Sequence, residues 1–175
     1  MTWIRLATTS EAIAACEVLR RCISECCVED HRSDPAILQK WLRNKTPETV
    51  ESWFAWPAHY PLVATVGDEV VGVAMLSRPG KIVLLHVDPA WRFSGIGSLL
   101  LQALEQKATK SGVGRLRVTS TFTARRFYES HGFDVLGTKN AAYGTALSMA
   151  KRIRTYCGEG EGGCGCGVMN NEALA

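Results

Sequence analysis

Two glycines closely spaced after an arginine are the residues in this sequence that most suggest chemistry. The stretch RFSGIG, residues 92–97, lies between a β-branched apolar run and a long helical pattern. A helix that begins here leaves backbone N–H groups unpaired at its positive end. Because Gly95 and Gly97 lack a Cβ, an anion can approach the main chain, and a diphosphate suits such a site. Arg92 adds a positive charge with a fork of donors for phosphate oxygens.

The spacing excludes two common phosphate-binding loops. A Walker loop needs four residues between its glycines and then a lysine, and this stretch has neither. A Rossmann loop needs a third glycine where Leu100 stands, and a carboxylate that the following strand pattern, RLRVT, does not supply. Two interpretations remain. One is a tight strand-to-helix turn without a ligand, and the other is the R-x-x-G-x-G loop that binds the pyrophosphate of coenzyme A.

A second motif, TARRFYESHGF at residues 123–133, follows the next expected strand. With both motifs in this order, the chain resembles the GNAT N-acetyltransferase superfamily. In that family the coenzyme loop is followed by a strand and by a short helix of the pattern A-x-x-F/L-Y-x-x-x-G-F. The order of expected elements over residues 1–153 is also similar to that fold. The chain departs from many members at Phe93, where they have glycine, and at Thr121, where they have asparagine.

The resemblance implies an acetyl-CoA site between two central strands that splay apart. The pantetheine arm would pair with the freed strand edge at residues 85–87, and the Val87 N–H would face the acetyl oxygen. Thr121 can still hydrogen-bond near the arm, and Arg125 and Arg126 either reach the phosphates or are surface charges. The residues expected to contact the coenzyme are Leu85, His86, Val87, Arg92, Phe93, Ser94, Gly95, Ile96, Gly97, Ser98, Thr121, Thr123, Arg125 and Tyr128.

Tyr128 and His86 are the candidate catalytic residues. Tyr128 resembles the family's tyrosine that protonates the departing thiolate, and a phenol of reference pKa about 10 is a donor at neutral pH. The competing interpretation is a core aromatic beside Phe127. His86 is the candidate base, since a free imidazole titrates near neutral pH. Strand alternation predicts that it shares a face with Ile82 and Leu84, where a hydrogen-bonded core histidine is the alternative.

The sequence defines the acceptor less closely. Glu29, Asp30, His31 and Glu51 could attract a cationic amine, although a solvated helix face explains each equally well, and water is a further candidate base. Because no cysteine shows the setting of a nucleophile, we expect direct acetyl transfer to a primary amine of a small molecule or peptide. The alternative is a non-catalytic acyl-CoA-binding sensor or interaction module, which would need the loop but neither acid nor base.

Hydrophobic periodicity, turn residues and caps predict the elements that must position these residues. Strands are expected at residues 2–6, 60–66, 70–76, 82–87, 115–119, 132–137 and 145–153, and helices at 8–27, 33–42, 45–56, 95–112 and 123–131. The expected N-caps are Thr9 or Ser10, then Asp34 and Thr46, the last two followed by proline. This order predicts an α/β (α+β mixed) fold with helices on both faces of one mixed sheet. The resemblance makes that sheet mostly antiparallel, with about seven strands.

Composition predicts one domain over residues 1–155 of the 175-residue chain. The net charge of +3 is too small to indicate a nucleic-acid partner. The excess of 20 basic over 14 acidic residues in 1–156 suits an anionic ligand, or is ordinary surface charge. No apolar run approaches the roughly 20 residues that span a membrane. We therefore expect a cytoplasmic protein without membrane contact, and a homodimer is compatible with the sequence.

Residues 156–175 are rich in glycine and cysteine and are expected to form a flexible tail. The spacing of Cys157, Cys164 and Cys166 fits no standard zinc pattern, so no metal site is predicted. Cys22 and Cys26 lie four residues apart on one expected helix face, and core packing is the simplest explanation for them in a reducing compartment.

Overall fold

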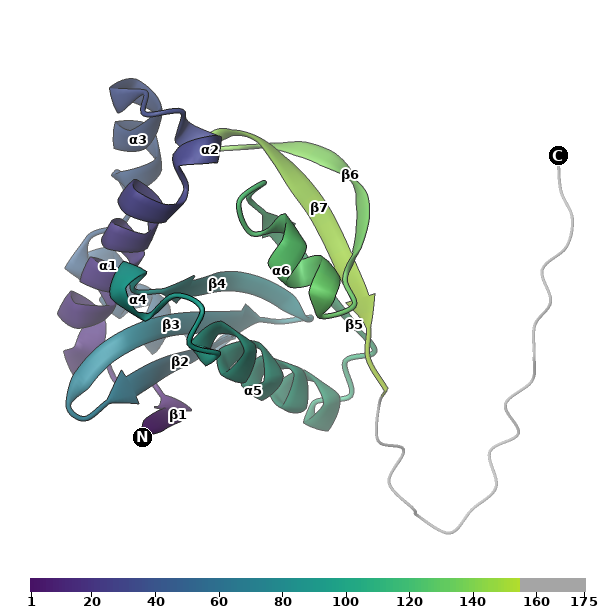
Figure 1. Cartoon of the computed structure of the whole chain (residues 1–175). Coiled ribbons are helices and arrows are strands. Elements are labelled where there is room, and N and C mark those ends of the chain that lie inside the picture. Colours follow the sequence, from purple (N-terminus) through teal and green to yellow (C-terminus); the bar gives the residue numbers. More distant parts are fainter. Residues whose placement is uncertain (155–175) are drawn as a thin grey trace, which may run out of the picture.

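The computed structural model describes residues 1–154, so the tail expected over 156–175 lies outside the described residues. A seven-stranded sheet forms the centre of the described part, and helices cover it (Figure 1). The strands are β1 (Thr2–Leu6), β2 (His59–Val66), β3 (Glu69–Ser77), β4 (Lys81–Val87), β5 (Arg115–Ser120), β6 (Asp134–Ala141) and β7 (Gly144–Arg152). The helices are α1 (Ala12–Arg21), α2 (Val28–His31), α3 (Pro35–Leu42), α4 (Pro47–Ala55), α5 (Ile96–Lys110) and α6 (Arg125–Ser130).

The sheet has the strand order β1-β2-β3-β4-β5-β7-β6, and every neighbouring pair is antiparallel except β4 and β5. Helices α5 and α6 pack on one face, and α1 and α4 pack on the other. In β3, Ala74 and Leu76 belong to the core under α5, whereas Val73 and Met75 belong to the core under α1. This period-2 alternation buries both faces and explains the continuous apolar run. The predicted mixed, mostly antiparallel sheet with helices on both faces is confirmed.

Side-chain caps begin the helices of the first third. The Asp34 carboxylate accepts from the N–H groups of the first turn of α3, and the Thr46 hydroxyl accepts from the Thr49 N–H in α4, as predicted. The first cap differs, because Thr8 rather than Thr9 or Ser10 occupies it. The Glu11 carboxylate accepts from the Thr8 N–H at 2.9 Å, the reciprocal bond of a Thr-x-x-Glu capping box.

The single helix predicted over residues 8–27 is wrong, because the chain leaves the α-helix after Arg21. A π-helical turn, Cys22–Cys26, follows α1, and the one-turn helix α2 comes after it. The Arg21 guanidinium donates to Asp88 at the end of β4 at 2.7 Å. A tertiary contact of this kind cannot be predicted from local periodicity.

The second difference from the prediction is β6, which extends to Ala141. Its second half is exposed and polar and pairs with β7, so it has no apolar alternation that would indicate a strand.

A β-bulge in β4 changes the direction of the side chains near the site. Met75 pairs with Leu84 and Leu76 pairs with Ile82, so Val83 is the extra residue. Ile82 therefore faces the core under α5, whereas Leu84 faces the core under α1. The prediction that His86 shares a face with both Ile82 and Leu84 is thus wrong for Ile82.

Strands β4 and β5 separate soon after they meet. They pair only at Lys81 with Arg117 and at Ile82 with Val118, so the second half of β4 has a free edge. The Asp88 N–H donates to the Val71 carbonyl of β3 at 2.8 Å. Because bonded and non-bonded positions alternate along an antiparallel pair, the Val87 N–H points away from β3 and into the gap. The splay between the two central strands is therefore present, with a backbone donor facing it.

Candidate active site

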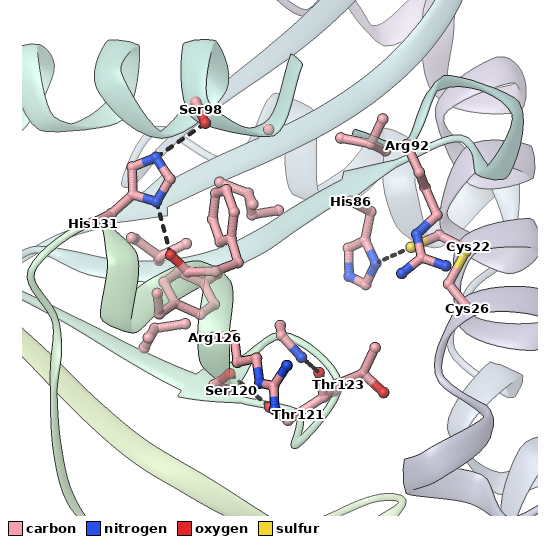
Figure 2. Close-up of a pocket in the computed structure, with 18 of the residues that line it drawn as sticks. Cys22, Cys26, His86, Arg92, Ser98, Ser120, Thr121, Thr123, Arg126 and His131 are labelled. Carbon is pink, nitrogen blue, oxygen red and sulfur yellow. Dashed lines mark hydrogen bonds between the residues drawn. The ribbon is translucent and has the colours of Figure 1, made fainter. Parts of the chain in front are cut away.

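A cleft of about 760 Å³ opens where β4 and β5 diverge. Its walls are the residues 82–87 of β4, the loop and first turn of α5, the segment from the end of β5 through α6, and the π-helical turn after α1. In Figure 2, His86 and Arg92 lie on one side of this cleft, and Thr121 and Thr123 of the turn after β5 lie on another, together with Arg126 of α6. The volume is in the range of cofactor sites in proteins.

Most residues that the motifs and the resemblance predicted at the coenzyme site meet at this cleft. Those that line it are Leu85, His86, Val87, Arg92, Phe93, Gly95, Gly97, Ser98, Thr121, Thr123 and Tyr128. Ser94 does not line it and donates to the Trp91 carbonyl, and Ile96 is buried in the core at 2% exposure. These two residues can contribute to a phosphate site only through their backbone.

The prediction that the Arg125 side chain lies at the site is not met. Arg125 forms an ion pair with Glu129, one turn on along α6, at 2.8 Å. Its neighbour Arg126 lines the cleft instead. The Arg125 guanidinium is instead held on the outer surface of α6 by its ion pair with Glu129.

The two glycines of the loop serve different geometrical needs. Gly95 has φ +85°, and a Cβ built there would have no heavy atom within 4 Å, so the start of α5 is open toward the cleft. A Cβ on Gly97 would lie 3.3 Å from the Phe127 ring, so this glycine allows close packing of α5 against α6. Phe93 has φ +61° although it is not glycine, and its side chain is 95% exposed. The loop thus adopts a backbone that glycine favours at Phe93 as well.

Tyr128 is buried at the inner wall of the cleft. Its side chain is 4% exposed, and its ring packs edge-on against Phe127 and Phe133. Burial raises the pKa of the phenol above its usual value, so the hydroxyl keeps its proton. Both interpretations of Tyr128 are therefore met in part, since the ring belongs to the core and the residue still lines the cleft.

Asp30 fixes the turn between β5 and α6, a role that the sequence did not reveal. Its carboxylate is buried and accepts from the Phe122 N–H at 2.7 Å and from the Thr123 hydroxyl at 2.7 Å. Within the same turn, the Thr121 hydroxyl accepts from the Ala124 N–H at 3.1 Å. The hydroxyl of Thr123 is therefore occupied by Asp30, and that of Thr121 retains a proton to donate into the cleft.

The other polar residues proposed for acceptor binding do not reach the cleft. His31 is buried and bonds within its own segment, to the Ser24 carbonyl and the Ser33 N–H. Glu29 and Glu51 are exposed and absent from the cleft walls. Cys22 and Cys26, which the sequence analysis assigned to packing, do line the cleft.

His131 joins the two motifs. Its Nδ1 donates to the Phe127 carbonyl at 2.7 Å, because a carbonyl can only accept, and its Nε2 lies 3.0 Å from the Ser98 hydroxyl (Figure 2). This contact links the first turn of α5 to the end of α6. The TARRFYESHGF motif therefore supports the glycine loop as well as carrying Tyr128.

Cys22 lies beside His86, and no sequence pattern indicated this contact. The Cys22 Sγ is 3.4 Å from His86 Nδ1, across 64 positions of the chain. The pKa of Cys22 is lowered below the ordinary range, with the neighbouring Cys27 thiol as the largest cause, and the His86 ring and the Val87 N–H act in the same direction. The expectation of direct transfer, which rested on no cysteine having a nucleophile's setting, stays a prediction.

Within residues 1–154, no three or more histidine, cysteine, aspartate or glutamate side chains gather as a metal site would require. In the same part of the chain, no helix is both long and apolar enough to cross a membrane.

A family model described as an acetyltransferase (GNAT) domain matches residues 27–152. A GCN5-related N-acetyltransferase from Rhodopseudomonas palustris superposes with a TM-score of 0.78 at 20% identity, covering 87% of this chain and 96% of its own. The PaiA N-acetyltransferase from Thermoplasma acidophilum, solved with coenzyme A, has a TM-score of 0.78 at 18% identity, covering 87% and 99%. The ribosomal-protein-S18-alanine N-acetyltransferase from Escherichia coli has a TM-score of 0.67 at 22% sequence identity, and the match covers 91% of this chain and 97% of that protein. At these identities the likeness shows the fold. No protein of curated function matches the chain in sequence.

Proposed function

The chain belongs to the GNAT acetyltransferase family, and we propose that it transfers the acetyl group of acetyl-CoA to the nitrogen of a primary amine. The observation that carries the proposal is one cleft that joins a glycine loop at a helix start, a free strand edge and a buried tyrosine. Similar structures include N-acetyltransferases solved with coenzyme A, which supports the choice of cosubstrate.

The start of α5 is suited to the diphosphate of the coenzyme. The first N–H groups of this 15-residue helix have no carbonyl partner within it and point toward the open side of Gly95. Arg92 and Arg126 line the same cleft and bring positive charge from the two motifs. A diphosphate held by backbone donors and two guanidinium groups would be neutralised without a metal ion.

The free edge of β4 is suited to the pantetheine arm and the acetyl group. The Leu85 and Val87 backbone groups face the gap, where the amides of the arm can pair with them as an added strand would. The Val87 N–H can then donate to the acetyl oxygen. As the carbonyl becomes tetrahedral its oxygen gains negative charge, so this hydrogen bond strengthens most in the transition state.

Tyr128 is the proposed acid for the leaving thiolate. The Tyr128 hydroxyl has no hydrogen-bond partner among residues 1–154. In this part of the chain every fully buried side-chain oxygen has a partner, so the Tyr128 oxygen is accessible, and the residue lines the cleft. The raised pKa keeps the phenol protonated until the coenzyme sulfur departs. The reacting amine must lose a proton, and His86, whose Nε2 has no partner in the described part of the chain, is the proposed acceptor for it.

The alternative to an acetyltransferase is a non-catalytic acyl-CoA-binding module, and a measurement of turnover distinguishes the two functions. The protein with acetyl-CoA should release coenzyme thiol faster when a suitable primary amine is added, and a panel of polyamines, amino sugars and peptides would cover the main acceptor classes. Binding of acetyl-CoA without thiol release from any amine in the panel would support the module instead.

A further inference from the structure

The turn that follows β5 lies where the two central strands are furthest apart. Strands β4 and β5 are parallel and pair only near their beginnings, so they diverge toward their ends. Residues 121–124 come directly after the end of β5, and Thr121, Thr123 and Ala124 line the cleft (Figure 2). Pairing with β4 cannot hold this turn in place, so its position depends on other contacts.

Asp30 of α2 makes such a contact with the turn. Its side chain is buried, and Oδ1 accepts from the Phe122 N–H at 2.7 Å. Oδ2 accepts from the Thr123 hydroxyl at 2.7 Å and from the Thr123 N–H at 3.3 Å. Hydrogen bonds to a charged carboxylate are stronger than those between neutral groups. Three of them therefore fix the turn to a helix that lies more than 90 positions away in the sequence.

Backbone hydrogen bonds continue from the turn into α6. The Phe122 carbonyl accepts from the N–H of Arg125, the first residue of α6, at 3.1 Å. The Ala124 carbonyl accepts from the Tyr128 N–H at 3.2 Å. A continuous series of bonds thus connects the Asp30 carboxylate with the backbone of Tyr128, through the turn that the carboxylate holds.

Helix α6 depends on this turn because it is short. It has six residues, and isolated helices shorter than about 12 residues are only marginally stable. Tyr128 is the fourth of the six, so it lies in the turn of helix that is bonded directly to residues 121–124. A shift of those residues would therefore move the Tyr128 side chain.

We propose that Asp30 is a positioning residue for the acid step, holding the turn before α6 so that the Tyr128 hydroxyl reaches the departing sulfur. The proposal rests on the proposed acetyltransferase function. Asp30 is not among the residues that line the cleft, so it acts through the turn and not on the coenzyme or the amine. A general acid must lie within hydrogen-bond distance of the atom it protonates, which makes its placement part of its effect.

Asp30→Asn tests the role at nearly constant size. The amide nitrogen cannot accept from Thr123, so this variant loses part of the contact with the turn. Turnover of an accepted amine should fall about 10-fold or more, in the range expected when a reacting group is displaced. The KM for acetyl-CoA should stay within about twofold, because the diphosphate loop belongs to α5 and the lost effect belongs to the transition state. Steady-state kinetics well below the melting temperature of each protein measure both.

The same substitution in a Tyr128→Phe protein distinguishes positioning from general support of the fold. Once the phenol oxygen is absent, Asp30 has no acid to position, so Asp30→Asn should change turnover by no more than about twofold. A carboxylate that only supports the fold would instead lower turnover by the same factor with and without that oxygen.

Two substitutions of Thr123 test the contact from the other side. Thr123→Val removes the hydroxyl that donates to Asp30 and should lower turnover, whereas Thr123→Ser keeps a hydroxyl and should restore most of it. If Asp30→Asn does not fold, Thr123→Val with and without Tyr128→Phe carries the same test. The matched control is Asp34→Asn, the same chemical change at the exposed N-cap of α3, which should leave turnover within about twofold.

Three results would overturn the positioning role. One is turnover within about twofold of the wild type in folded Asp30→Asn or, if that variant does not fold, in Thr123→Val, below the effect of a displaced acid. Another is a loss confined to the KM for acetyl-CoA. The third is an equal loss of turnover with and without the Tyr128 hydroxyl. In each case, continued amine acetylation by the wild-type protein would leave the proposed function standing. Absence of amine acetylation by the wild-type protein would instead contradict the proposed function itself.

Discussion

The Tyr128 hydroxyl is the single atom on which the acid step depends. Tyr128→Phe removes that oxygen and keeps the ring between Phe127 and Phe133, so packing should survive. We expect turnover to fall about 100-fold, the lower end of general-acid effects, because thiolate is a good leaving group. Coenzyme affinity should barely change, since the lost interaction belongs to the transition state.

Steady-state kinetics and a binding titration measure the two effects separately. Tyr143→Phe is the matched control, because Tyr143 stacks on Trp41 and does not line the cleft. If Tyr128→Phe keeps turnover within about twofold, the residue is only part of the cleft wall.

A second prediction at the residue scale concerns Glu11 and pH. The ion pair and hydrogen bonds with Arg5 and Thr8 lower the pKa of Glu11 from 4.5 to about 2. A carboxylate with a lowered pKa stabilises the fold above pH 4.5, and this contribution is lost as the pH falls toward 2. Glu11→Gln should therefore cost about 1 kcal/mol of unfolding free energy at neutral pH, a typical capping loss.

The difference between Glu11→Gln and wild type should shrink below pH 4.5 and vanish near pH 2, which chemical denaturation across pH can follow. A difference that stays constant over this range would show that the charge of Glu11 is not the source of the stabilisation.

Individual side-chain directions were only partly predictable. The motifs predicted Tyr128 and Arg92 at the cleft, because each belongs to a local pattern, whereas Val87 was placed there by the family resemblance. His86 could not be assigned to a face, because the bulge at Val83 depends on the pairing of β4 with β3. The contact of Cys22 with His86 joins residues 64 positions apart, and spacing within the sequence does not encode it.

The glycine loop and α5 form the element that should hold the diphosphate, and Gly95 offers a matched test. Acetyl-CoA should raise the melting temperature of the wild-type protein, because it binds only the folded state. Gly95→Asp and Gly95→Asn place side chains of nearly equal size in open space, at a φ of +85° that both tolerate better than most residues. Only the aspartate puts a negative charge against the diphosphate.

We expect Gly95→Asp to abolish the shift in melting temperature and Gly95→Asn to retain part of it, as thermal denaturation with and without acetyl-CoA would show. Equal shifts in the two variants would contradict the assignment of the phosphate site to this loop.

Elements were predictable where local chemistry determines them. The caps at Asp34 and Thr46 and the glycine turn before α5 were recognised from residue type and position. The π-helical turn after α1 was not, and the residues at its start, Arg21 and Cys22, contact Asp88 and His86, which are more than 60 positions away in the sequence. Cys22 and His86 both line the cleft, so this contact shapes part of its wall.

At the scale of the whole molecule, the sheet and its two helical layers account for the site without the C-terminal segment. A chain that ends at Tyr156 should keep the melting temperature and the coenzyme affinity of the full protein, because residues 1–154 contain the sheet, both cores and the cleft. Thermal denaturation and a binding titration of the shortened chain would check this. Loss of either property would show that residues 157–175 contribute to the fold or to the site.

The most direct measurement of the central claim is the stoichiometry of acetyl transfer. The full-length protein, acetyl-CoA and an accepted primary amine are incubated together, and coenzyme thiol and amine product are quantified in the same samples by absorbance and mass spectrometry. The account predicts one N-acetylated amine for each thiol released, at a rate that depends on both substrates. Thiol release without an N-acetylated product, or none above the uncatalysed rate for every amine class, would contradict it.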